Sequence, residues 1–163
     1  ITNEITNFMP LAHRLESINL INGIEYVNDS KSTNINSTLS ALRSFEKNII
    51  LILGGLDKCN TDFSKLQSFI NYKIKIIVSY GSSGKKIHEQ LNPIIDTKYI
   101  QNFDDCILYA IKNSCSGDKV LLSPACASYD QFKNYEERGD RYKKLISQLK
   151  EKIAWKKSSA LFT

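Results

Sequence analysis

The chain has 163 residues, of which 42% are hydrophobic and 24% charged, so one folded domain with a single core is expected rather than a disordered chain. Its formal net charge is +5, but the basic residues are spread along the sequence, which does not favour a nucleic-acid partner. A small anionic substrate would suit such a mildly basic domain.

Two strands are predicted first, on either side of Asn22-Gly23 in "HRLESINLINGIEYVND" (13–29). Asn-Gly is the strongest local indication of a hairpin, because both turn residues accept a positive φ. Four later apolar runs predict further strands, at 48–55, 74–81, 97–100 and 118–124. They are rich in Ile, Val and Leu without alternation, which is typical of strands covered on both faces.

Helices are predicted between these strands, at about 35–46, 62–72, 82–91, 103–114 and 136–153. Thr33 or Asn34 is expected to cap the first helix, and Thr61 or Asp62 the second. The alternation of strand and helix predicts an α/β, Rossmann-like three-layer domain: a mostly parallel six-stranded sheet with an antiparallel N-terminal hairpin strand and helices on both faces. Residues 151–163 are expected to finish the last helix and then form a loose terminus.

Several classes of protein are disfavoured by what the sequence lacks. The four cysteines form no C-x-x-C pair and the two histidines are isolated, so neither a zinc site nor a disulfide framework is indicated. No apolar run approaches the roughly 18 residues of a membrane span. The chain also begins without Met and with a polar segment, which suggests a piece of a longer protein.

Polar segments follow four of the predicted strands. In parallel sheets ligands bind beyond the carboxyl ends of the strands, where loops and helix N-termini converge. The segments are "NDSKSTN" (28–34), "GGLDKCNTDF" (54–63), "GSSGKK" (81–86) and "SPACASYDQFKN" (123–134). Lysines and hydroxyls beside small residues can hold carboxylate or phosphate oxygens, although Lys31 and Lys58 could equally be solvated lysines beside a capped helix and a tight glycine turn.

"GSSGKK" does not fit a P-loop, which needs four residues between its glycines and Ser or Thr after the lysine. A self-sufficient nucleotide-binding domain is therefore not expected. His13 and His88 are interpreted as packing or surface residues, and Trp155 as a helix-packing anchor. Cys126 is interpreted as a small buried residue, because no histidine lies nearby in the sequence to activate it.

"NDSKSTN" (28–34), "LILGGLDK" (51–58) and above all "LLSPACASYDQFKNYEERGD" (121–140) closely resemble the C-terminal domain of the Mur ligases, and within them the branch that adds D-glutamate. The resemblance runs from about residue 13 to the last helix. It implies an ATP-dependent, cytoplasmic ligase of peptidoglycan synthesis that joins D-glutamate to UDP-N-acetylmuramoyl-L-alanine through an acyl phosphate.

The resemblance also implies that residues 1–163 form the third domain of such an enzyme. The N-terminal domain and the central domain, which carries the P-loop and binds ATP and Mg²⁺, are then expected outside this chain. The chain alone is expected to be inactive, to hold no cofactor or metal, and to be a monomer without nucleic-acid or membrane partners. A hinge is expected to close this domain against the central one.

Carried over residue by residue, the resemblance implies a catalytic Lys31 that approaches the transferred phosphate. It implies contacts to D-glutamate from Thr33, Lys58, Ser128 and Tyr135, the last through its backbone N–H. It also implies contacts to the nucleotide from Arg14 and Asp29.

Three positions depart from the family pattern, since Ser32, Tyr129 and Tyr135 stand where Ala, Leu and Phe are common. The charge of 136–140 is interpreted as the solvated start of the last helix, so that only the first half of 121–140 is expected to touch substrate.

Two alternatives stay open. The first is a sibling Mur ligase or a folylpolyglutamate synthetase, which share this fold; the "DSKSTN" segment argues against it. The second is a non-catalytic binding module of the same fold.

Overall fold

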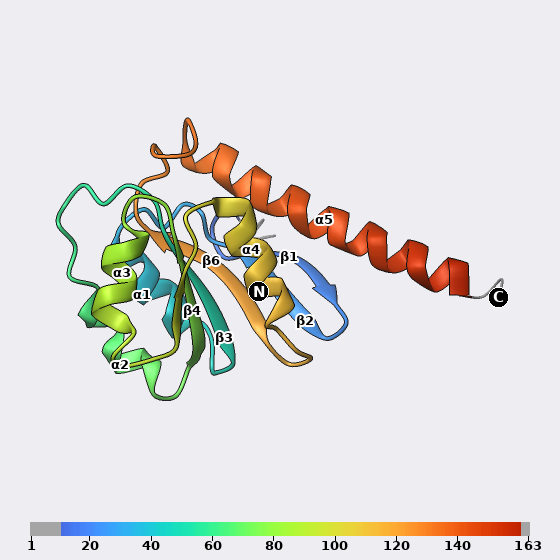
Figure 1. Cartoon of the computed structure of the whole chain (residues 1–163), viewed down its shortest axis with the longest axis horizontal. Coiled ribbons are helices and arrows are strands. Elements are labelled where there is room, and N and C mark those ends of the chain that lie inside the picture. The colour runs from blue at the N-terminus through green and yellow to red at the C-terminus, as the bar shows by residue number, and fades with distance from the viewer. Residues whose placement is uncertain (1–10, 161–163) are drawn as a thin grey trace, which may run out of the picture.

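The apolar runs of the sequence form one six-stranded sheet in the computed structural model, which describes residues 11–160 (Figure 1). The strands lie in the order β1-β2-β6-β3-β4-β5. β1 pairs with β2 antiparallel, and every other pair is parallel. The prediction of a mostly parallel sheet with an antiparallel N-terminal strand is therefore confirmed. In chain order the elements are β1 (Glu16–Ile21), β2 (Ile24–Asn28), α1 (Ile35–Arg43), β3 (Ile49–Gly54), the 3₁₀ helix η1 (Phe63–Leu66), α2 (Gln67–Ile70), β4 (Ile74–Tyr80), α3 (Gly84–Leu91), β5 (Thr97–Tyr99), α4 (Phe103–Lys112), β6 (Lys119–Ala125) and α5 (Tyr135–Ala160).

The two edges of the sheet are the hairpin strand β1 and the three-residue strand β5. Asn22 and Gly23 turn the hairpin with φ of 52° and 77°, as their sequence predicts. The pairing of β1 with β2 is interrupted by a bulge between Ser17 and Asn19. Both edges are therefore short or irregular.

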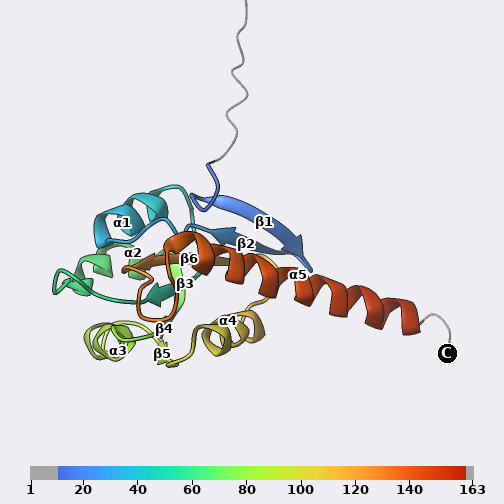
Figure 2. The same cartoon turned by 90° about the horizontal axis from the view of Figure 1, so that it is seen from above.

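The core has two halves, one on each face of the sheet. All six residues of β3 are buried, and because neighbouring side chains of a strand point to opposite faces, they divide between the two halves. Leu51 and Leu53 pack with α1, α2 and α3, whereas Ile50 and Ile52 pack with α4 and α5. Figure 2 shows these two groups of helices on opposite sides of the sheet, which confirms the predicted three layers.

Some helix boundaries differ from the prediction for local reasons. The predicted helix at 62–72 is a 3₁₀ turn followed by one turn of α-helix, and Asp62 caps it by accepting from the Ser64 N–H at 3.0 Å. α3 begins at Gly84 rather than 82, and the N–H of the preceding Ser83 bonds the carbonyl of Gly55, just after β3. At the end of α1 the Ser44 N–H bonds back to Ala41, three residues earlier, which tightens the last turn.

α5 is longer than predicted and extends past the sheet, as Figure 1 shows. It runs from Tyr135 to Ala160 instead of 136–153. Ile153 still packs against the core, whereas Trp155, just beyond it, is 71% exposed. The interpretation of Trp155 as a packing anchor is therefore wrong. The terminus expected to be loose, residues 161–163, lies outside the described residues.

The start of α5 packs closely against His13. This imidazole is buried, and its Nδ1 lies 3.0 Å from Nδ2 of Asn28. Gly139 faces it, and a Cβ at Gly139 would lie 2.1 Å from His13 Nδ1. His13 is thus a packing residue, as the sequence suggested, and Gly139 leaves the room that the ring needs.

We predict that Gly139→Ala destabilises the protein by about 1–3 kcal/mol through overpacking against His13. In an exposed helix the same change would stabilise by up to about 1 kcal/mol, so the sign of the effect is diagnostic. Urea unfolding followed by circular dichroism measures it. Ser147→Ala, at an exposed position of the same helix, is the control and should leave the free energy of unfolding unchanged or slightly raised. An equal rise in that free energy for both variants would show that the His13 ring is not packed against Gly139.

Candidate functional site

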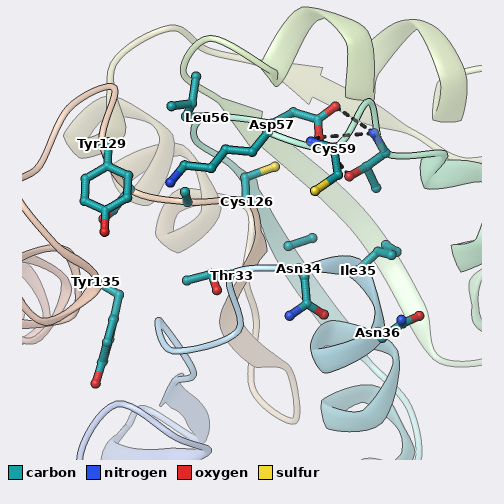
Figure 3. Close-up of a pocket in the computed structure, with 15 residues that line it drawn as sticks. Thr33, Asn34, Ile35, Asn36, Leu56, Asp57, Cys59, Cys126, Tyr129 and Tyr135 are labelled. Carbon is teal, nitrogen blue, oxygen red and sulfur yellow. Dashed lines mark hydrogen bonds between the residues drawn. The ribbon is translucent and has the colours of Figure 1, made fainter.

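Four of the residues predicted to bind substrate line one cavity of about 450 Å³ at the carboxyl ends of β2, β3 and β6. They are Thr33, Lys58, Ser128 and Tyr135. The residues come from the three connections after β2, β3 and β6, which the parallel sheet brings together at the carboxyl ends of its strands. Figure 3 shows Thr33, Cys126, Tyr129 and Tyr135 around this space.

Thr33 is placed by the turn that joins β2 to α1. Asn34 caps α1 by accepting from the Ser37 N–H at 3.0 Å, so Thr33 is not used for the cap. The Thr33 N–H bonds the carbonyl of Lys31 at 2.9 Å, and the Lys31 N–H bonds the carbonyl of His13 at 3.0 Å. The backbone of this turn is therefore fixed on both sides, and the Thr33 side chain lies at the cavity.

Lys58 is carried by a loop that touches the loop after β6. The Leu56 N–H bonds the carbonyl of Ala127 at 2.7 Å, and the Ala127 N–H bonds Leu56 in return at 3.1 Å. A Cβ on Gly55 would lie 2.2 Å from that Ala127 carbonyl oxygen, so the two loops approach this closely only because Gly55 has no side chain. Lys58 itself is exposed, and its Nζ lies 4.3 Å from the centroid of the Tyr129 ring.

The loop around Lys58 is held by its neighbour Asp57. This carboxylate accepts from Lys86 Nζ at 2.8 Å, from Thr61 Oγ1 at 2.8 Å and from the Thr61 N–H at 2.9 Å. Burial alone would raise the pKa of Asp57, but the bonds from Lys86 and Thr61 outweigh it and lower that pKa to about 2. The last lysine of "GSSGKK" thus binds a protein carboxylate, in keeping with the rejection of a P-loop.

Small residues after β6 bring the backbone to the cavity. Ala125 has a φ of 60°, an unusual value for a residue with a side chain. Cys126 is buried, which confirms its interpretation as a small buried residue, and burial raises the pKa of its thiol to about 11. Ser128 follows at the cavity wall. Phe132 packs inward, with its ring centroid 4.9 Å from that of Phe103.

Tyr135 is the first residue of α5, so its N–H belongs to the helix N-terminus. Among residues 11–160 this N–H has no hydrogen-bond acceptor, and such groups bind anions readily. The carbonyl of Tyr135 accepts from Ser30 Oγ at 2.7 Å. Lys31 does not line the cavity, but its Nζ lies 5.8 Å from the Tyr135 ring centroid. The lysine therefore stands beside the cavity rather than within it.

The two remaining predicted residues, Arg14 and Asp29, line a second cavity of about 390 Å³ together with Ser32, Ser37, Ser40 and Ser44. Asn36 lines both cavities, so they are neighbours. The Asp29 carboxylate is buried and accepts from Ser32 Oγ at 2.5 Å and from Ser123 Oγ at 2.7 Å. Burial raises the pKa of Asp29, and these bonds oppose the rise. Asp29 is thus largely committed to protein donors.

Sequence reasoning missed one residue of this region, Arg138. Its side chain is fully buried, whereas the charge of 136–140 was expected to be solvated. The guanidinium donates to both oxygens of Ser30 at 2.8 Å, to the carbonyl of Cys126 at 3.0 Å and to the hydroxyl of Tyr80 at 3.2 Å. Helical periodicity could have predicted its burial. Arg138 lies one turn before the buried Tyr142 and therefore on the face of α5 that packs on the core.

Within residues 11–160 no group of three or more His, Cys, Asp or Glu side chains could hold a metal ion. In the same range no helix has the length and apolarity to cross a membrane.

The family described as "Mur ligase, glutamate ligase domain" matches residues 13–126. A UDP-N-acetylmuramoylalanine--D-glutamate ligase from Salinibacter ruber is 38% identical over 150 residues, covering 91% of this chain and 32% of that protein. The protein of the same name from Christiangramia forsetii is 41% identical over 150 residues, covering 91% and 34%. The chain thus spans about a third of the length of these relatives.

A solved structure has the same fold. The murein peptide ligase of Psychrobacter arcticus superimposes with a TM-score of 0.53 at 14% identity, over 80% of this chain and 30% of that one.

We predict that Asp57→Asn lowers the free energy of unfolding by about 1–2 kcal/mol at neutral pH. The pKa of Asp57 is lower in the folded protein than in an unfolded chain, so the ionised carboxylate stabilises the fold above about pH 4, and this contribution is lost as the pH falls through about 2. Denaturant unfolding across this range should show the difference between the two proteins shrink toward acid pH. Glu89→Gln, which breaks the exposed pair with Lys85, is the control and should change stability by less than about 0.5 kcal/mol at any pH.

Proposed function

The chain belongs to the Mur ligase family, in its glutamate ligase domain, and on this basis we propose that it is the D-glutamate-binding C-terminal domain of a UDP-N-acetylmuramoylalanine--D-glutamate ligase. The observation that carries the proposal is the cavity of about 450 Å³ lined by Thr33, Lys58, Ser128 and Tyr135. The names of relatives 38–41% identical over 91% of the chain support the choice of amino acid.

The reaction we propose for the complete protein joins D-glutamate to UDP-N-acetylmuramoyl-L-alanine. The carboxylate of the UDP-linked substrate is first converted to an acyl phosphate. The amine of D-glutamate then attacks the carbonyl carbon, a C–N bond forms, the nitrogen loses a proton to solvent, and phosphate leaves with the electron pair of the broken C–O bond. ATP would supply the phosphoryl group and Mg²⁺ would offset its charge; we propose that the central domain binds both.

The residues of this chain bind and orient D-glutamate. The substrate has two carboxylates, and the ammonium of Lys58 supplies a positive charge at the cavity for one of them. The hydroxyls of Thr33 and Ser128 donate hydrogen bonds, and the Tyr135 N–H at the start of α5 holds a carboxylate oxygen. Lys31, beside the cavity, offsets the charge that develops on the transferred phosphate. Held in this way, the amine is close to its target before reaction.

The second cavity suits part of a nucleotide. Serine hydroxyls and the exposed guanidinium of Arg14 can bond a ribose or a phosphate edge, and we propose that Arg14 and Asp29 contact the nucleotide from this side. The main role of Asp29 is to position the hydroxyls of Ser32 and Ser123, because its carboxylate already accepts hydrogen bonds from both. The "GSSGKK" lysine that could resemble a phosphate ligand is bound to Asp57, so this chain supplies only one side of a nucleotide site.

We further propose that residues 1–163 form a single domain of a cytoplasmic, monomeric enzyme without nucleic-acid or membrane partners. The N-terminal and central domains would occupy the other two-thirds of the length seen in relatives. The site would be completed when this domain closes on the central one, so the chain alone would show no turnover.

We predict that Lys31→Ala in the full-length protein lowers kcat for amide formation by at least about 100-fold, because an electrostatic group that acts in the transition state is lost. Phosphate release that depends on D-glutamate measures it. Lys144→Ala, at an exposed position of α5, is the control and should match the unchanged protein. Near-normal activity of Lys31→Ala would remove this lysine from the site.

We predict that the full-length protein incorporates D-glutamate in preference to L-alanine, meso-diaminopimelate, L-lysine and L-glutamate. The site residues Lys58, Thr33 and Ser128 suit a dicarboxylate, and the relatives named as D-glutamate ligases favour this enantiomer. Competition among these amino acids, with the product identified by mass spectrometry, measures it. Preference for one of the others would favour a sibling ligase or a folylpolyglutamate synthetase. Absence of ATP-dependent turnover with all of them would favour a non-catalytic module.

A further inference from the structure

The buried guanidinium of Arg138 joins the segments that carry the proposed D-glutamate contacts. Its Nε and Nη2 donate to Oγ and O of Ser30, the residue directly before Lys31. Its Nη1 donates to the carbonyl of Cys126, two residues before Ser128. Arg138 itself lies one turn after Tyr135, whose carbonyl accepts from the same Ser30 hydroxyl. One side chain therefore sets the spacing of three walls of the cavity.

The surroundings leave room for a planar fork at this position. A Cβ on Gly55, in the loop that leads to Lys58, would lie 3.2 Å from Nη1 of Arg138. The hydroxyl of Tyr80, at the end of β4, accepts a further bond at 3.2 Å. Arginine can make these divergent bonds because its donors lie in one rigid plane, whereas a lysine ammonium is a compact point charge on a flexible stem.

The bonds of Arg138 are an inefficient way to gain stability. Its four acceptors are neutral, and within residues 11–160 it forms no salt bridge with a carboxylate. A buried charge of this kind loses its hydration, and apolar side chains of similar volume often serve stability equally well. A guanidinium can hold the backbone carbonyls of different loops in a fixed geometry, and an apolar side chain cannot.

We propose that Arg138 is a positioning residue of the D-glutamate site, which holds the turn bearing Lys31 and Thr33 at a set distance from the loop bearing Ser128. The inference rests on the proposed function, since it assigns a role within that site. Arg138 touches no substrate in this account. It acts through the backbone of Ser30 and Cys126.

The test compares Arg138→Lys with Tyr142→Phe in the full-length protein. Tyr142 lies one turn further along α5, is fully buried, and donates to the carbonyl of Val120 at 2.8 Å. Each variant thus removes buried hydrogen bonds between α5 and the sheet, but only Arg138 bonds the loops at the cavity. Unfolding curves of both variants establish how much stability each has lost.

For Arg138→Lys we expect kcat/KM for D-glutamate to fall by about 10- to 100-fold, as small displacements of reacting groups do. KM for D-glutamate should rise, while KM for the UDP-linked substrate stays within about twofold, because that substrate binds elsewhere. Tyr142→Phe should keep kcat/KM within about twofold of the unchanged protein. Normal kinetics of Arg138→Lys, or equal losses in the two variants, would overturn the positioning role.

Hydrogen exchange gives a second measurement that does not depend on activity. The N–H groups of Lys31, Ala125 and Ala127 bond to His13, Ser32 and Leu56 across the joined loops. They should exchange faster in Arg138→Lys and at the normal rate in Tyr142→Phe; unchanged exchange in both would count against the role. If the unchanged protein shows no turnover with D-glutamate, the proposed function fails and hydrogen exchange alone decides the role of Arg138. If it turns over normally and so does Arg138→Lys, only the positioning role fails.

Discussion

The loops that follow β2, β3 and β6 meet at the carboxyl ends of these strands. The backbone polar groups that are buried there must find partners other than water. Leaving a buried N–H or carbonyl without a partner costs about as much as losing a hydrogen bond. Arg138 meets this requirement for the carbonyls of Ser30 and Cys126. Beside it, the buried Asp29 carboxylate accepts from the hydroxyls of Ser32 and Ser123 and from the Leu15 N–H. The cavity wall consequently has its shape without any ligand.

Most of the fold could be predicted because it depends on local patterns. Continuous runs of Ile, Val and Leu indicate strands buried on both faces, and β3 is such a strand. Asn22-Gly23 fixes the hairpin through its positive φ values, and Asn34 fixes the start of α1 through its side chain. Each of these features is decided by neighbours in the sequence, so the sequence alone is enough to find it.

The candidate site could be predicted only in part. The position of polar segments at strand ends follows from the parallel sheet, but Thr33, Ser128 and Tyr135 were singled out by family resemblance rather than by spacing. The burial of Arg138 depends on Ser30, which lies 108 residues away in the sequence. The exposure of Trp155 depends likewise on where the packing of α5 against the core ends. Such properties belong to the assembled layers, and no short window of sequence contains them.

The bulge in β1 bears on how the protein behaves at high concentration. An exposed edge strand offers unpaired backbone groups to a second molecule, and long regular edges promote strand exchange and aggregation. Here one edge is interrupted between Ser17 and Asn19, and the other, β5, is only three residues long. Neither edge is a good template for adding a further strand. The sheet is thereby protected against growing from one molecule into the next, which helps a domain made largely of Ile-rich strands to remain dispersed in a crowded solution.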